Sequence, residues 1–173
     1  MRQRVVIALA LCANPRLIIA DEPTTALDVS IQAQIITLLK KLCRDHGTAV
    51  MLVTHDMGVI AETSDRVAVM YSGRIAEIGP VQDVVQNPLH PYARGLMGAI
   101  PTLAGEDKRL VQIPGSMPRL SAIPPGCSFN PRCVSVFDRC RVDRPEPLPH
   151  RTQSVACHLY DTAPHHAAKE TAA

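Results

Sequence analysis

Two acidic residues and a histidine follow two short apolar runs of the sequence, in positions suited to phosphoryl chemistry. Asp21 and Glu22 come directly after the run at residues 17–20, and His55 follows the run at residues 48–54. One carboxylate can hold a magnesium ion through water, a second can orient an attacking water, and an imidazole can contact the transferred phosphate or hold that water. We therefore treat Asp21, Glu22 and His55 as candidates for one site.

The elements expected around these residues would place them at one edge of a sheet. The run at 17–20 is typical of a strand buried on both faces, and residues 48–54 predict a second strand. Between them, apolar spacing over 30–44 predicts a helix capped by Asp28 or Ser30. Strand, helix and strand in this order favour a parallel βαβ unit, whose strand ends meet in one crevice.

Each half of this pattern also has an ordinary structural explanation. An Asp-Glu pair after a strand is by itself usually a helix cap or a solvated turn, and the same holds for the Thr-His-Asp string at residues 54–56. Their joint placement at the ends of two successive strands favours a functional site.

Three strings of the sequence resemble motifs of the ABC ATPase family. Residues 17–24 resemble its Walker B strand, residues 25–28 its D-loop and residues 53–56 its H-loop, in the family's order and spacing. Residues 1–4 resemble the start of the helix that follows the family's signature motif. The resemblance implies a protein that binds ATP and Mg²⁺.

The same resemblance implies a role for each candidate residue. Asp21 would be the carboxylate on the magnesium side, and Glu22 the catalytic glutamate that polarises water. His55 would be the switch histidine, and Asp28 a contact across the dimer of ATPase subunits.

One part of the family's machinery is not found in the 173 residues. None of the nine glycines lies in a G-x-x-x-x-G-K-[ST] string, whose backbone amides and lysine hold nucleotide phosphates. The apolar helix expected at residues 3–13, predicted to be buried, also begins without a capping residue. We expect a C-terminal fragment in which Met1 is internal or a misassigned start, and which is inactive alone.

The composition changes in the second half of the chain. Twelve of the fifteen prolines lie beyond Asn87. Before that point, residues 66–71 and 74–78 predict a hairpin with its turn at Ser72-Gly73, and residues 81–86 predict a helix. After it, residues 92–100 predict one further helix.

We therefore predict an α/β fold: the C-terminal half of a P-loop NTPase parallel sheet, followed by an irregular proline-rich extension that contains cysteines. Residues 1–86 would be a partial nucleotide-binding domain, residues 87–161 the extension, and residues 162–173 a disordered tail.

The extension resembles the C-terminal region of importer ATPases for oligopeptides, dipeptides and nickel. The resemblance is carried by residues 87–96, 113–116 and 124–133. Within the first string, a proline-flanked histidine and tyrosine usually cap a turn and pack a helix start, so we assign His90 and Tyr92 a structural role.

Four cysteines of the extension are candidate metal ligands: Cys127, Cys133, Cys140 and Cys157. Four thiolates can close a tetrahedral zinc site or ligate an iron-sulfur cluster, and either would staple a segment poor in apolar residues. Their spacing does not choose between the metals, and the subfamily resemblance implies a 4Fe-4S cluster. Zinc, a substitution of one ligand by His158, and four reduced thiols remain alternatives.

Charge and hydropathy argue against a nucleic-acid partner and against a membrane-spanning helix. The formal net charge is +2, and the basic residues are scattered, so we expect no nucleic-acid partner. The longest apolar run, residues 5–13, is too short to span a bilayer.

The family resemblance implies the remaining partners and the function. The partners would be a second ABC ATPase subunit, identical or paralogous, and transmembrane permease subunits, at the cytoplasmic face of the bacterial plasma membrane. The function would be ATP hydrolysis that energises peptide import. The alternative is a non-catalytic interaction fragment or a metal-binding module that docks on a transporter.

Overall fold

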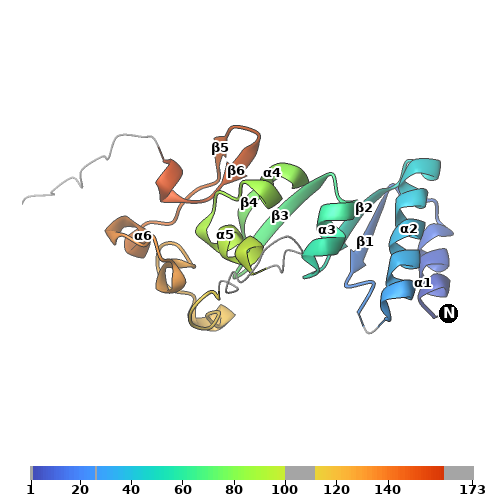
Figure 1. Cartoon of the computed structure of the whole chain (residues 1–173), viewed down its shortest axis with the longest axis horizontal. Coiled ribbons are helices and arrows are strands. Elements are labelled where there is room, and N and C mark those ends of the chain that lie inside the picture. The colour runs from blue at the N-terminus through green and yellow to red at the C-terminus, as the bar shows by residue number, and fades with distance from the viewer. Residues whose placement is uncertain (1, 26, 100–111, 162–173) are drawn as a thin grey trace, which may run out of the picture. The chain divides into compact units, whose positions relative to one another are not determined.

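A computed structural model describes residues 2–25, 27–99 and 112–161 of the chain (Figure 1). The chain divides into two compact units, Met1–Ser64 and Asp65–Ala173. Within the described ranges, no helix is long and apolar enough to cross a membrane. The predicted tail, residues 162–173, lies outside the described residues.

The first unit contains the predicted parallel βαβ arrangement. Strand β1 (Leu17–Asp21) pairs in parallel with β2 (Ala49–Val53), and helix α2 (Val29–His46) connects them. Asp28 caps α2, as the sequence predicts, and Gly47 ends it with a φ of 63°, which is readily adopted only by glycine. The strands therefore end at the same edge.

One face of α2 forms the core of this unit. Ile35, Leu39 and Leu42 are buried, with Ile7 and Leu11 packed against them. The last two belong to α1 (Arg2–Leu11), and the short helix α3 (Met57–Thr63) follows β2. The apolar spacing of α2 thus predicts its packing correctly.

Two predictions of complete burial are wrong for the described chain. Helix α1 was expected to be buried all round, but Leu9 is 67% exposed. Strand β1 was expected to be buried on both faces, but Ile19 is 62% exposed, while its neighbour Ile18 is buried. Successive strand residues point to opposite faces, so α2 and its neighbours cover only one side of β1 and β2.

The second unit is built on an antiparallel sheet in the order β3-β4-β6-β5. Strands β3 (Arg66–Tyr71) and β4 (Arg74–Pro80) form the predicted hairpin. Its turn residues Ser72 and Gly73 have φ values of 46° and 76°, as a tight two-residue turn requires.

Strands β5 (Leu148–His150) and β6 (Gln153–Val155) complete this sheet, and the sequence does not predict them. Strand β6 pairs with β4 through the Glu77–Val155 and Ile78–Ser154 positions. The hairpin consequently lies in the same unit as the extension. The structure divides the chain after Ser64, whereas the sequence places a domain boundary after residue 86.

Short helices and turns surround this sheet and carry the cysteine region. They are α4 (Val81–Gln86), α5 (Pro91–Gly98), α6 (Asp138–Val142) and the 3₁₀ turns Leu120–Ala122, Asn130–Arg132 and His158–Tyr160. Tyr71, Tyr92 and Phe129 pack together, with ring centroids of Tyr71 and Tyr92 4.7 Å apart. This aromatic cluster ties the hairpin to α5 and to the loop that contains Cys127.

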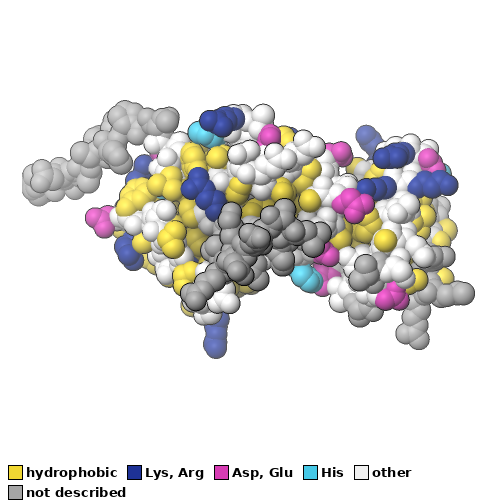
Figure 2. Space-filling model, in the orientation of Figure 1, with side chains coloured by type: hydrophobic (Ala, Val, Ile, Leu, Met, Phe, Trp, Pro, Cys, Tyr) yellow, Lys and Arg dark blue, Asp and Glu magenta, His cyan; other side chains and the backbone are white. Residues whose placement is uncertain are grey.

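Acidic and basic side chains both occur on the face shown in Figure 2, among apolar and neutral polar ones. Neither sign of charge predominates on that face, which agrees with the nearly balanced net charge of +2.

Candidate functional site

The structure brings Glu22 and His55 together at the edge where β1 and β2 end. The backbone N–H of Glu22 donates to the carbonyl of Val53 over 2.8 Å, which extends the strand pairing by one residue. Glu22 has a φ of 43°, an uncommon value for a residue with a side chain. Its Oε1 lies 3.0 Å from Nδ1 of His55. The bend after β1 therefore aims the carboxylate along the edge towards β2.

Thr25 supports this pair, although it was not among the residues for which the sequence predicts a catalytic role. Its hydroxyl donates to Glu22 Oε2 over 2.8 Å, so each carboxylate oxygen has one partner. The Thr25 hydroxyl, and then His55, lower the pKa of the Glu22 carboxyl. The Glu22 and His55 side chains are 46% and 84% exposed. An ionised carboxylate in reach of solvent suits a group that orients water.

Asp21 precedes Glu22 as the last residue of β1, opposite Val53 of β2. Within the described residues, no three His, Cys, Asp or Glu side chains gather closely enough to hold a metal ion. Mg²⁺ is usually held by one or two carboxylates together with waters and nucleotide phosphates. The role of Asp21 as the carboxylate on the magnesium side therefore stays a prediction.

Asp28 lies at the start of α2 and does not join the Glu22–His55 pair. Its Oδ1 accepts hydrogen bonds of 2.8 Å from the backbone of Ile31 and from the hydroxyl of Ser30. The Ile31 bond is the largest cause of the lowered pKa of Asp28. Of the two residues predicted as possible caps, Asp28 and not Ser30 caps α2, while its role at a dimer contact stays a prediction.

Asp56 anchors the residue next to His55, and it does so as a helix cap, the ordinary structural explanation of the Thr-His-Asp string. It caps α3 by accepting from the backbone N–H of Val59 over 3.1 Å, and it accepts from Gln32 Nε2 over 2.9 Å. Because Gln32 lies on α2, these bonds fix the end of β2 against that helix. The sign of this cap in the sequence is an aspartate directly before a predicted short helix.

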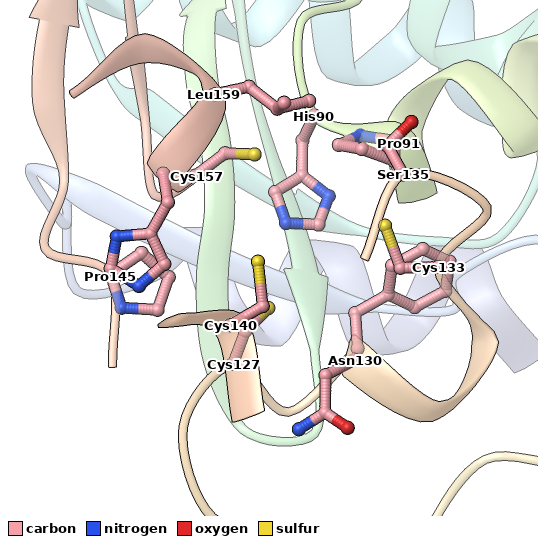
Figure 3. A pocket seen from close by; sticks show the side chains of 12 residues that line it. His90, Pro91, Cys127, Asn130, Cys133, Ser135, Cys140, Pro145, Cys157 and Leu159 are labelled. Carbon is pink, nitrogen blue, oxygen red and sulfur yellow. The ribbon is translucent and has the colours of Figure 1, made fainter. Parts of the chain in front are cut away.

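The four cysteines of the extension line one cavity in the second unit (Figure 3). They come from different segments: Cys140 lies in α6, Cys157 follows β6, and Cys127 and Cys133 flank the turn at Asn130–Arg132. The sequence prediction that these four residues cluster therefore agrees with their placement.

Gly126 allows two of these segments to approach closely. It has a φ of 71°, and a Cβ atom at this position would lie 2.4 Å from the carbonyl oxygen of Cys140. The next residue, Cys127, donates its backbone N–H to that same oxygen over 2.9 Å. The loop before Cys127 can reach α6 only because residue 126 has no side chain.

Burial sets the protonation of the thiols. It raises the pKa of Cys127 and Cys133, and raises that of Cys157 to about 11. The other three cysteines also raise the pKa of Cys157, so charges on these sulfurs repel one another. Raised pKa values favour the protonated form of these three thiols, and a bound metal would draw off their protons.

The donor set fits a thiolate-bound metal group. Four soft sulfur donors face one cavity, as zinc and iron-sulfur sites both require. Among the described residues, however, no three such side chains lie close enough to share one ion. A tetrahedral zinc site needs four sulfurs about 2.3 Å from one atom, whereas a cluster spreads its ligands over several irons.

Two histidines also line this cavity. His90 is 97% buried, since only 3% of its surface is exposed, and burial lowers its pKa to about 4. As predicted, it caps a helix: its Nδ1 accepts from the backbone N–H of Tyr92 over 3.0 Å. The sequence did not indicate that the same ring faces the cysteines. The second histidine, His158, lies next to Cys157.

Comparison with known proteins identifies the family. Residues 76–140 match the family model described as the oligopeptide/dipeptide transporter, C-terminal region. Over 162 residues, the chain is 51% identical to the oligopeptide transport ATP-binding protein AppD of Bacillus subtilis. The chain belongs to the oligopeptide/dipeptide transport ATP-binding proteins.

Other members of this transport ATP-binding family match over most of the chain. Identity is 53% over 142 residues to OppD of Haemophilus influenzae, and 48% over 168 residues to the dipeptide transport protein DppD of Bacillus subtilis. These matches cover 82% and 96% of this chain, and 93% for AppD. They cover 49%, 44% and 50% of AppD, OppD and DppD, so the chain spans about half the length of these relatives.

A solved structure matches part of the chain. It is the dimeric post-hydrolysis state of the ATP-binding cassette MJ0796 bound to ADP and Pi, with a TM-score of 0.42 and 40% sequence identity. The match covers 46% of this chain and 34% of that one.

Proposed function

We propose that the protein to which this chain belongs hydrolyses ATP to energise peptide import through an ABC transporter. The observation that carries the proposal is the 3.0 Å contact of Glu22 with His55 at the ends of two parallel strands. Sheets of this kind bind ligands at that edge. The peptide cargo is proposed from the printed names of the relatives AppD, OppD and DppD.

Each side chain of the edge has a task in hydrolysis. Glu22 accepts a hydrogen bond from the attacking water and draws off its proton as the water oxygen bonds to the terminal phosphorus. The bond between that phosphorus and the bridging oxygen breaks, and ADP leaves with the bridging oxygen. Thr25 and His55 hold the two carboxylate oxygens of Glu22 in place. Asp21 would hold Mg²⁺ through water, and the ion would offset charge on the phosphate oxygens.

The partners follow from the same proposal. A second ABC ATPase subunit would clamp nucleotide against this one, with Asp28 at the contact, and transmembrane permeases would convert the closure into peptide passage. The protein would then act as a peripheral subunit at the cytoplasmic face of the bacterial plasma membrane. No nucleic acid takes part.

The four cysteines would bind a 4Fe-4S cluster, with Zn²⁺ as the alternative. Their convergence on one cavity from separate segments supports a metal staple. The choice of the cluster over zinc rests on the resemblance of the extension to that of peptide importer ATPases. The cluster would hold the loop before Cys127, α6 and the segment after β6 together.

Nucleotide binding tests the functional proposal. The 173 residues hold no G-x-x-x-x-G-K-[ST] string, so we expect this chain alone to bind MgATP weakly and not to hydrolyse it. Joined to the upstream coding sequence, it should bind MgATP at micromolar concentration and hydrolyse it. If the joined protein binds no nucleotide, the alternative of a non-catalytic module that docks on a transporter is supported.

A further inference from the structure

The hydrogen bonds of His90 define which of its ring nitrogens carries the proton. The backbone N–H of Tyr92 donates to Nδ1 over 3.0 Å, so Nδ1 must present a lone pair. In a neutral imidazole one nitrogen is a donor and the other an acceptor. Nε2 of His90 therefore carries the proton and is a hydrogen-bond donor.

The backbone around His90 is held by a buried carboxylate. Glu77 of β4 has no exposed surface, and it accepts from the N–H groups of Leu89 and His90 over 3.0 and 2.8 Å. The His90 ring also packs near Phe129, with centroids 5.8 Å apart. The ring is consequently fixed at both its backbone and its face.

This fixed donor lies among the four sulfurs. His90 lines the same cavity as Cys127, Cys133, Cys140 and Cys157, and Figure 3 shows its ring among their sulfur atoms. A protonated Nε2 cannot bind a metal, because it has no lone pair to give. It can instead donate to a thiolate.

We propose that His90 donates a hydrogen bond from Nε2 to a thiolate sulfur of the four-cysteine centre and is not itself a ligand. The inference rests on the proposed metal centre. Such a bond stabilises negative charge on sulfur and withdraws electron density from the metal, which makes an iron-sulfur group easier to reduce. His90 is thus a positioning and tuning residue that links the centre to α5 and, through Glu77, to β4.

His158 has the opposite arrangement. Its Nε2 lies 2.9 Å from the carbonyl oxygen of Asp143, which can only accept, so this Nε2 carries the proton. Nδ1 of His158 then has the free lone pair. If a histidine replaces a cysteine as ligand, the hydrogen bonds assign that role to His158 and not to His90.

The test compares variants of the chain purified without oxygen. Iron per chain is measured first, then the reduction potential by titration followed with electron paramagnetic resonance. His90→Leu should keep its iron and become harder to reduce, because the four thiolates remain and one donor is lost. His90→Gln, which retains an N–H donor, should lie closer to wild type. His150→Leu, outside the cavity, is the matched control and should match wild type.

Several results would overturn the inference. Full iron content with an unchanged potential in His90→Leu would show that no such bond exists, and loss of iron in every folded His90 variant would make His90 a ligand. If the variants do not fold, wild-type protein with isotopically labelled histidine decides by pulsed resonance. If His90 is a hydrogen-bond donor, its nitrogen couples weakly to the electron spin and an exchangeable proton is detected. If His90 is a ligand, its nitrogen couples strongly.

Failure of the metal-centre proposal can be distinguished from failure of the His90 proposal alone. Wild-type protein without iron or zinc, even after reconstitution, overturns the metal centre and the role of His90 with it. If the protein holds zinc, the same variants are compared by cadmium NMR after substitution. An unchanged cadmium shift in His90→Leu overturns the donor role alone.

Discussion

The Oε1 atom of Glu22 and the Nδ1 atom of His55 lie 3.0 Å apart, although 33 residues separate them in the chain. The register of the two parallel strands explains this contact, because both strands end at the Asp21–Val53 pair. Glu22 follows one position, and His55 two positions, after that pair. The helix between the strands returns the chain to the same edge. A βαβ unit is therefore sufficient to assemble this pair of groups.

The Thr25 hydroxyl should affect the pH dependence of ATP hydrolysis by the joined protein. It is the largest cause of the lowered pKa of Glu22, so Thr25→Ala should raise that pKa. Glu22 acts when ionised, and activity on the acid side should then be lost at a higher pH than in wild type. The pH profile of kcat measures the change.

Thr37→Ala is the matched control, since the Thr37 hydroxyl bonds only within α2, to the carbonyl of Ala33. The role of Thr25 in lowering the pKa of Glu22 would be contradicted by two results. One is an unshifted acid limb of the kcat–pH profile in Thr25→Ala, and the other is an equal shift in Thr37→Ala.

The Asp56 cap should contribute to the stability of the first unit. Asp56→Ala leaves the N–H of Val59 without its side-chain partner and should lower the free energy of unfolding by about 1 kcal/mol. Urea titration at neutral pH measures the loss. Asp56→Asn, which retains an acceptor, should lose less.

The same residue gives a pH dependence with a defined sign. Folding lowers the pKa of Asp56 below its ordinary value of 3.8, chiefly through the Val59 bond. The stabilisation is therefore fully present above that value and is lost as the pH falls through the folded-state pKa. If wild type and Asp56→Asn lose stability in parallel over this acid range, the assignment is wrong.

Gly126 should tolerate no side chain. Gly126→Ala would place a Cβ against the Cys140 carbonyl and force a φ of 71° on alanine, so we expect a loss above about 2 kcal/mol. Gly73→Ala is the control, because Gly73 has a φ of 76° but nothing within 4 Å of the added atom. It should lose about 1–2 kcal/mol, from backbone strain alone. Equal losses in denaturant titrations would argue against the close approach at Gly126.

The cysteines should differ in their effect on bound metal. Cys127→Ser and Cys140→Ser each remove one of the four sulfurs at the cavity, and we expect iron content to fall sharply in both. Cys43→Ser changes a free thiol of α2 in the other unit and should leave iron content unchanged. Iron analysis of anaerobic preparations makes the comparison. Retention of full iron in both cavity variants would remove these residues as ligands.

The sequence predicted the first unit well where the pattern was long. Eighteen residues of α2 show a clear apolar face, and Asp28 marks their start, so the helix and its cap could be predicted. The exposed faces of α1 and β1 could not, because an apolar residue in a sequence does not indicate what lies against it. Thr25 was missed because its hydroxyl acts only after the bend at Glu22 has formed.

The second unit was harder to predict for a physical reason. Strands β5 and β6 have three residues each, and one of these is Pro149, so no alternation of apolar and polar residues can develop. The pairing of β6 with β4 depends on contacts between residues far apart in the chain, such as Ile78 and Ser154. The cysteines could be selected from the sequence because their residue type restricts their chemistry, whereas His90 was recognised only as a cap.

The central claim is that Glu22 activates water at the edge of β1 and β2, and one measurement tests it most directly. ATP hydrolysis is compared between the chain joined to its upstream coding sequence and the same protein carrying Glu22→Gln, with Glu62→Gln, an exposed acid on α3, as the control. We predict that kcat falls about 10²- to 10⁴-fold in Glu22→Gln, with MgATP still bound, and that the control retains wild-type activity. Wild-type hydrolysis by Glu22→Gln would contradict the account.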